Sequence, residues 1–264
     1  MVRRTLDLAG QYFFSLLLLI CLNSLQPLFA VNPDSDYKDA LALFEKRDVV
    51  SRIRAITILE KNLETKADHL DSQALISYAY VHEAYIMSQV GEPATEYQNS
   101  ADAFSKAVLA QQPQNLYARK TALFLQLIAG NHVDARKILE RDVTEKENDA
   151  DMWYMLAAVS EGEKANKSLT KALTLNPDHV WIYSDMAFRA IKMGDIAVAE
   201  KWIKALETRR PGVPEADLLR AVVAANRKDK KRAKEHWVDF ARKAPDSAIV
   251  SKLGAAGRKK STKG

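Results

Sequence analysis

The feature that most constrains this chain of 264 residues is a period of 34 residues in its second half. Proline recurs at this spacing, at Pro177, Pro211 and Pro245. Alanine recurs in the same phase, at Ala165, Ala199 and Ala233, and a bulky apolar residue follows each alanine by four positions: Leu169, Ile203 and Trp237. Because four residues are about one helical turn, the period predicts a repeated pair of helices in which a small residue lets the two helices approach. Proline cannot continue a helix, so it closes each unit.

These residues resemble the tetratricopeptide repeat, whose pattern of small and aromatic positions extends over 34 residues. Residues 178–211 carry that pattern as Tyr183, Met186, Ala187, Ala199, Ile203 and Pro211. The resemblance covers about residues 115–245 and is looser over 37–114. Departures are Ala190 in place of an aromatic residue, and Asp217 and Arg220 at expected apolar positions. The resemblance implies an all-α fold, a tetratricopeptide-type α-solenoid.

Apolar periodicity and turn residues predict about six antiparallel helix pairs between residues 37 and 243 and no strand of useful length. The step from Ala135 to Ala165 is only 30 residues, so one helical turn is expected to be missing near residues 161–164. A short capping helix is expected within 246–257. Each pair of a solenoid buries its face against neighbouring pairs, which predicts one continuous array over residues 31–257. The helices are expected at 37–47, 50–64, 71–89, 95–111, 115–129, 132–146, 149–160, 163–175, 179–193, 195–209, 214–227 and 230–243.

The first 30 residues have the order of a secretory signal peptide: a basic start at Arg3 and Arg4, a short apolar run, and a polar stretch before Ala30. Cleavage there would begin the mature chain at Val31, and an uncleaved segment would serve as an N-terminal anchor. Cys21 follows Ile20, whereas a lipoprotein signal needs a small residue there, so Cys21 is interpreted as an apolar residue of the signal. The protein is therefore expected to be exported, to a periplasm or the outside, with a basic flexible tail at 258–264.

Nothing in the sequence predicts catalysis, a cofactor or a metal site. Phosphate-binding glycine loops and nucleophile motifs are absent. The single Cys excludes a disulfide framework and a cysteine-based zinc site. Asp149 and Asp151 open a predicted helix, where capping explains them. The five histidines are expected in surface or turn positions: His69, His82, His132, His179 and His236.

Aromatic residues seven apart recur in three of the predicted first helices, and this spacing places them on one helix face. In a tetratricopeptide array that face lines the concave side, so we expect a partly exposed aromatic groove for a peptide or protein. The alternative interpretation is that the rings are core. Trp153, Trp202 and Trp237 are assigned to packing. The predicted groove residues are Tyr78, Tyr85, Tyr117, Lys120, Phe124, Tyr154, Trp181, Asp185, Phe188 and Lys192.

Residues 37–120 also resemble the T component of TRAP transporters, through the strings ALALFEKRD at 40–48 and YAYVHEAYIM at 78–87. That resemblance implies a periplasmic accessory of a transporter with a cavity for a small apolar solute. A third interpretation is a scaffold for envelope assembly that works through end or edge contacts.

Charge is distributed unevenly along the chain. Residues 227–264 contain 13 Lys and Arg against four Asp and Glu, whereas residues 31–226 have a net charge of −5. A solvated last helix and tail would explain the basic part, and contact with an anionic membrane surface is the functional alternative. Nucleic acid is not expected as a partner, because the chain is expected to be exported and has no base-stacking module.

Overall fold

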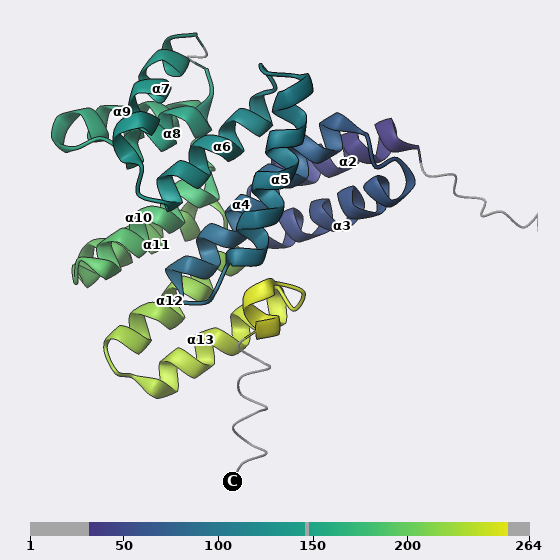
Figure 1. Cartoon of the computed structure of the whole chain (residues 1–264). Helices are drawn as coiled ribbons and strands as arrows, with labels where there is room; N and C mark the ends of the chain where they lie inside the picture. The colour runs from purple at the N-terminus through teal and green to yellow at the C-terminus, as the bar shows by residue number, and fades with distance from the viewer. Residues whose placement is uncertain (1–31, 146–147, 253–264) are drawn as a thin grey trace, which may run out of the picture. The chain divides into compact units, whose positions relative to one another are not determined.

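The computed structural model describes residues 32–145 and 148–252, and this part of the chain is helical with no strand (Figure 1). The helices follow one another as hairpins joined by short turns. They are α2 (Pro33–Phe44), α3 (Val49–Thr65), α4 (Leu70–Gln89), α5 (Thr95–Gln111), α6 (Leu116–Ile128), α7 (His132–Glu145), α8 (Ala150–Ala158), α9 (Gly162–Leu175), α10 (Val180–Lys192), α11 (Ile196–Arg209), α12 (Pro214–Asn226) and α13 (Lys230–Lys243).

These helices confirm the six predicted pairs, with ends that differ from the expected ones by a few residues. Local side chains account for many of the starts. Asp48, Asn115 and Asp195 each accept a hydrogen bond from a backbone N–H in the first turn of the helix that follows. Such caps satisfy backbone donors that have no partner within the helix. Pro214 fits the first turn of α12, where its missing N–H costs nothing.

The small residues of the repeat lie where two helices of one pair meet. Ala187 of α10 and Ala199 of α11 are both completely buried, as is the bulky partner position Ile203 at 1% exposure. The predicted phase of the repeat is therefore consistent with the packing in this pair.

The missing turn lies in the fourth pair, at the end of α8. This helix has 9 residues, whereas α6, α10 and α12 each have 13. Helix α9 keeps the full 14 residues of α7 and α11. The prediction of a missing turn is thus correct, and its place is just before residues 161–164 rather than inside the second helix.

The first pair contacts the sixth, which the sequence did not predict. The backbone N–H of Val49, at the start of α3, donates to Glu215 Oε1 of α12 over 2.5 Å. Arg210, in the turn that joins the fifth pair to the sixth, donates to the carbonyl of Lys46 and to Asp48 Oδ2. The expectation that each pair packs only against its neighbours is therefore wrong for the two ends of the array.

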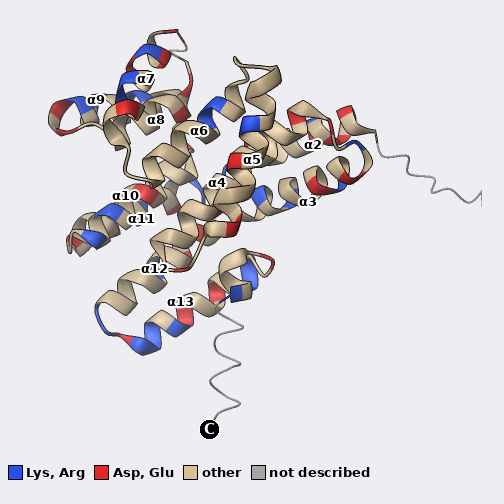
Figure 2. Cartoon of the chain, in the orientation of Figure 1, with Lys and Arg blue, Asp and Glu red and all other residues tan. Residues whose placement is uncertain are grey.

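Several predicted segments lie outside the described residues: the signal segment 1–30 with Cys21, and the tail 258–264. The predicted capping helix is helical over residues 248–252, where the description ends. None of the described helices combines the length and apolar character that crossing a membrane requires. Lys and Arg gather along α13 and the turn that precedes it (Figure 2).

Candidate functional site

Aromatic side chains from four helices meet in the interior formed by the first helices of the pairs. The ring centroids of Phe44 and Trp181 are 5.4 Å apart, and those of Tyr78 and Trp181 are 6.2 Å apart. Tyr117 lies 5.9 Å from Tyr78. The imidazole of His82 packs against Trp181 with centroids 3.5 Å apart. The predicted aromatic residues of different repeats are thus brought together, although they are far apart in sequence.

The expected solvent access of this aromatic surface is wrong. Trp181 is 5% exposed, Phe188 4%, Phe124 2% and Tyr78 1%, while Tyr85 and Tyr117 are half-buried. For Trp181 and Tyr78 the physical reason is that Phe44, at the end of α2, packs against both rings, and Arg47 of the following turn lies over Trp181. The core interpretation left open by the sequence therefore describes the burial of the rings, and a role in binding stays a prediction.

The polar members of the predicted groove have different surroundings. Lys120, Tyr154 and Asp185 are buried, whereas Lys192 is exposed at the end of α10. The hydroxyl of Tyr85 donates to Asp185 Oδ1, and Arg189 Nε donates to Asp185 Oδ2. Burial raises the pKa of Asp185, although Arg189 opposes that rise.

Asp151 is the centre of a buried ionic cluster. Arg47 Nη1 and Lys120 Nζ each donate to its Oδ2 over 2.9 Å, and His179 Nε2 lies 2.7 Å from its Oδ1. Lys120 also pairs with Asp149 over 2.7 Å. Burial acts to raise the pKa of Asp151, but Arg47 and Lys120 hold it well below the ordinary value. Asp149 caps α8 as expected, while Asp151 does more than cap: it joins α8 to the first, third and fifth pairs.

A second buried group lies beside the first. Arg52 Nε donates to Glu83 Oε1 over 2.7 Å, and the remaining Arg52 nitrogens have no hydrogen-bond partner. Glu215 is 3% exposed, and burial raises its pKa to about 7. Burial and the nearby Arg52 lower the pKa of His82 well below the ordinary value, so this imidazole is neutral.

A pocket opens between α4, α6, α8, α10 and α12. Its cavity volume is about 20 Å³, which is room for about one water molecule. Six of the ten predicted groove residues line it: Tyr85, Phe124, Tyr154, Trp181, Asp185 and Phe188.

Four buried polar atoms on residues lining this pocket have no hydrogen-bond partner: His82 Nε2, Trp181 Nε1, Ser184 Oγ and Glu215 Oε2. Buried polar atoms in native proteins are paired in the large majority of cases. Their gathering around a single pocket therefore marks it as a place for a polar occupant with an apolar surround.

Sequence reasoning missed several of these residues. His82 lies inside α4 at 2% exposure, which corrects its expected surface or turn position. His179 lies in the turn before α10 as expected, but its side chain is completely buried. His69 is also buried and caps α4 by accepting from the N–H of Ser72. Arg52, Glu83 and Glu215 carry no sequence signal, because charged residues on a helix normally face water. Trp153, Trp202 and Trp237 pack against the core as expected.

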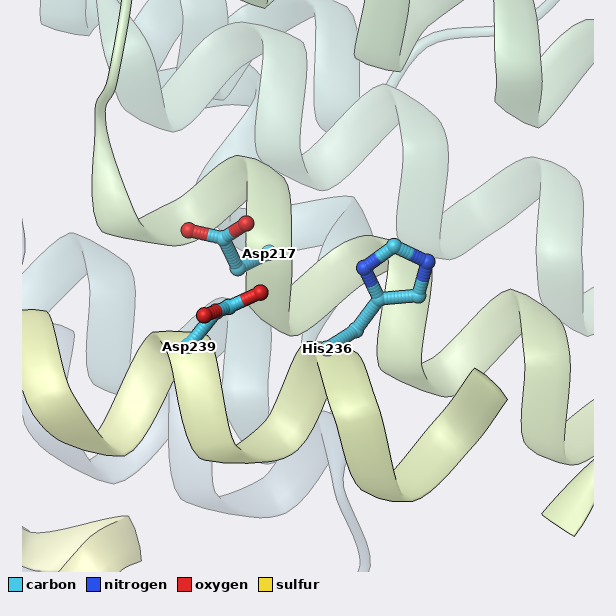
Figure 3. A group of neighbouring side chains, drawn as sticks. All are labelled: Asp217, His236 and Asp239. Carbon is cyan, nitrogen blue, oxygen red and sulfur yellow. The ribbon is translucent and has the colours of Figure 1, made fainter. Parts of the chain in front are cut away.

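One group of three side chains in the described part of the chain has metal-ligand geometry: Asp217 of α12 and His236 and Asp239 of α13 (Figure 3). Their ligand atoms lie within 4.8 Å of one another. However, Lys243 donates to Asp217 Oδ2 over 2.6 Å and Arg242 donates to Asp239 Oδ1 over 2.8 Å. These cations already neutralise both carboxylates, so the cluster is explained as surface ion pairs.

No family model matches the chain, and no curated protein matches it. A solved structure, that of the APC/C hetero-tetramer Cut9–Hcn1, contains a chain similar to this one, with a TM-score of 0.52 and 18% identity. The similarity covers 79% of this chain and 38% of that chain, so the present protein spans well under half of its length. Yeast Tom70 gives a TM-score of 0.44 at 15% identity, covering 80% of this chain and 44% of that one. Pseudomonas aeruginosa PilF gives 0.40 at 17%, covering 85% and 97%.

At these identities a structural likeness shows the fold alone, and the two lower scores carry no further argument. Nothing found supports the resemblance to the T component of TRAP transporters. The helix pairs, the 34-residue phase and the likeness to the Cut9 structure agree with one another. The chain has the tetratricopeptide-type α-solenoid fold.

Proposed function

We propose that this protein is a non-catalytic binding module that receives part of a polypeptide partner in the pocket between α4, α10 and α12. The observation that carries the proposal is the set of four unpaired buried polar atoms around one aromatic pocket. Trp181 Nε1 can only donate, and Ser184 and His82 can donate or accept. A peptide carbonyl with an apolar side chain beside it would satisfy both the polar atoms and the rings.

The pocket is nearly closed and needs a small movement to admit such a group. Its rim includes Tyr85 and Ile86, which are half-buried, while the deeper residues Phe124, Phe188 and Trp181 are buried. Side-chain rotation at the rim is the least costly way to widen it, because the core rings pack on all sides. A small apolar solute is the alternative occupant, and the experiment below separates the two.

The chemistry of the cluster favours binding over catalysis. Asp151 is ionised, and both of its oxygens hold cationic or imidazole partners. A general base must face a substrate, whereas Asp151 is 1% exposed and three side chains already hold its two oxygens.

We further propose that the protein works outside the cytoplasm, on the basis of the signal-like residues 1–30. The basic surface of α13 would then face the envelope, and contact with anionic lipid headgroups is part of this proposal. Sequencing the N-terminus of the protein from its native source should find Val31 or a residue within a few positions.

The binding proposal is tested by blocking the pocket at its rim. Ile86→Trp should fill the opening, whereas Val133→Trp on α7 adds the same side chain at a position that is 66% exposed. Both variants and the wild type are used as bait for cross-linking in an envelope extract. A polypeptide captured by the wild type and Val133→Trp but lost with Ile86→Trp supports the proposal. Equal capture by all three contradicts it, and a small molecule released from the wild type alone in native mass spectrometry favours the solute.

A further inference from the structure

Arg47 has a backbone conformation that the other pairs mostly reserve for glycine. Its φ is 61°, in the left-handed region, and it lies in the turn between α2 and α3. The corresponding turns carry Gly91, Gly130 and Gly194, each with a φ near 80°. Side chains are disfavoured in this region because Cβ crowds the neighbouring carbonyl. Lys228, in the turn between α12 and α13, has the same conformation with an exposed side chain, so the argument for a role of Arg47 rests on what its side chain contacts.

The Arg47 side chain lies in a site built by other elements. Its Nη1 donates to Asp151 Oδ2 of α8 over 2.9 Å. Its Cζ lies 4.9 Å from the ring centroid of Trp181 and 5.9 Å from that of Phe44. An arginine suits this site better than a lysine, since the planar guanidinium stacks on aromatic faces while it pairs with a carboxylate.

The site does not depend on Arg47 for its form. Lys120 of α6 and His179, the residue before α10, both hold Asp151 in place through separate contacts. Trp181 is fixed independently by His82. The receptor for a guanidinium would therefore persist when the α2–α3 turn leaves it.

Arg47 is also an incomplete occupant. Within the described residues its side chain makes one hydrogen bond and its Nε has no partner, while the side chain remains 13% exposed. Guanidinium groups bind carboxylates best through two parallel hydrogen bonds. Because its backbone conformation is strained and it makes one hydrogen bond to Asp151, Arg47 can be replaced by another arginine.

We propose that the site formed by Asp151 and Trp181 is a receptor for an arginine side chain, which Arg47 fills within the chain and which an arginine of a polypeptide partner fills when the α2–α3 turn withdraws. The inference rests on the proposed polypeptide-binding function and names the chemistry of that partner. A basic segment fits the charge of residues 31–226, which contain the site and have a net charge of −5.

The receptor is tested by removing Arg47 and supplying an arginine from solution. In Arg47→Gly the turn keeps its backbone conformation and the site is vacated. N-acetyl-arginine amide should then raise the Tm of the variant in proportion to the logarithm of its concentration, as a ligand of the folded state does. Lys228→Gly is the matched control, because Lys228 also has a positive φ, of 62°, and is exposed.

The outcome is read from three comparisons. Stabilisation of Arg47→Gly, with no change in Lys228→Gly and none from the neutral analogue N-acetyl-citrulline amide, supports the receptor. No stabilisation, or an equal effect in the control, overturns it. Arg47→Gln serves in the same assay if the glycine variant does not fold.

Displacement in the wild type is measured by hydrogen exchange at the Val49 amide, which donates to Glu215 when the turn is closed. An arginine-containing peptide should accelerate this exchange, and an unchanged rate at a concentration that stabilises Arg47→Gly overturns the displacement step. Neither assay uses the cellular partner. If both arginine assays fail but Ile86→Trp abolishes capture of the polypeptide, the arginine receptor is rejected and the proposed binding function stands. If the arginine assays succeed but Ile86→Trp does not affect capture, only the pocket is rejected as the binding site.

Discussion

Glu215 is a buried acid whose ionisation opposes folding. Burial raises its pKa from 4.5 to about 7, so the folded protein binds a proton more tightly than the unfolded chain. For a carboxyl with a raised pKa, the stabilising contribution is complete below the unfolded value of 4.5 and is lost as the pH rises through about 7. The difference corresponds to about 3 kcal/mol of unfolding free energy at higher pH.

Glu215→Gln should remove this pH dependence, since glutamine imitates the protonated acid and still accepts from Val49. We expect the unfolding free energy of the variant to exceed that of the wild type above pH 7 and to converge with it below pH 4.5. Urea unfolding at several pH values provides the comparison. Parallel curves for the two proteins would show that Glu215 does not titrate in this range.

Some residues of the site could be identified from neighbouring positions in the sequence, and others could not. The seven-residue spacing of Trp181 and Phe188 is local, so the sequence indicated that they share a face. Trp181 is also covered by Phe44 and Arg47, which lie more than 130 positions away in the chain and have no periodic pattern that would reveal the contact. The left-handed turn position of Arg47, where other repeats have glycine, is the signal that could have drawn attention to it.

At the scale of the helix, a larger side chain where α10 and α11 cross should destabilise the fold. Ala199 is completely buried at this crossing. Ala199→Trp should lower the unfolding free energy by about 1–3 kcal/mol or more, because a packed interior cannot absorb an indole without strain. Ala197→Trp, on the exposed face of the same helix, should change it by less than about 0.5 kcal/mol.

Circular dichroism melts of both variants measure this difference. If Ala199→Trp melts at the same temperature as Ala197→Trp, the two helices do not cross at this alanine.

The helices themselves were predictable because each depends on nearby residues: prolines between pairs, glycines within them, and acidic or amide caps such as Asp195. The shortening of α8 was visible in the sequence only as a break in the period near residues 161–164. The break gives the number of missing residues but not which of the two adjoining helices is shorter.

At the scale of the whole array, the contacts between the first and sixth pairs should make unfolding a single event. An open solenoid gains stability from neighbouring repeats only and can unravel from its ends. Here Val49 bonds to Glu215, and Arg210 bonds to Lys46 and Asp48, so the ends support each other. Helix content and tryptophan fluorescence should therefore follow one urea transition in the wild type. Arg210→Ala should separate the two curves, and coincident curves in that variant would argue against this coupling.

The bond between Val49 and Glu215 also bears on how such a chain can evolve. Families of open solenoids lengthen or shorten by duplicating or deleting a repeat, since each new unit needs only a neighbour. In this protein an added or lost pair between α3 and α12 would carry Glu215 away from Val49 and expose the charges that the α2–α3 turn covers. We therefore expect the number of helix pairs to stay constant among relatives, and their loops to vary in length before the number of pairs does.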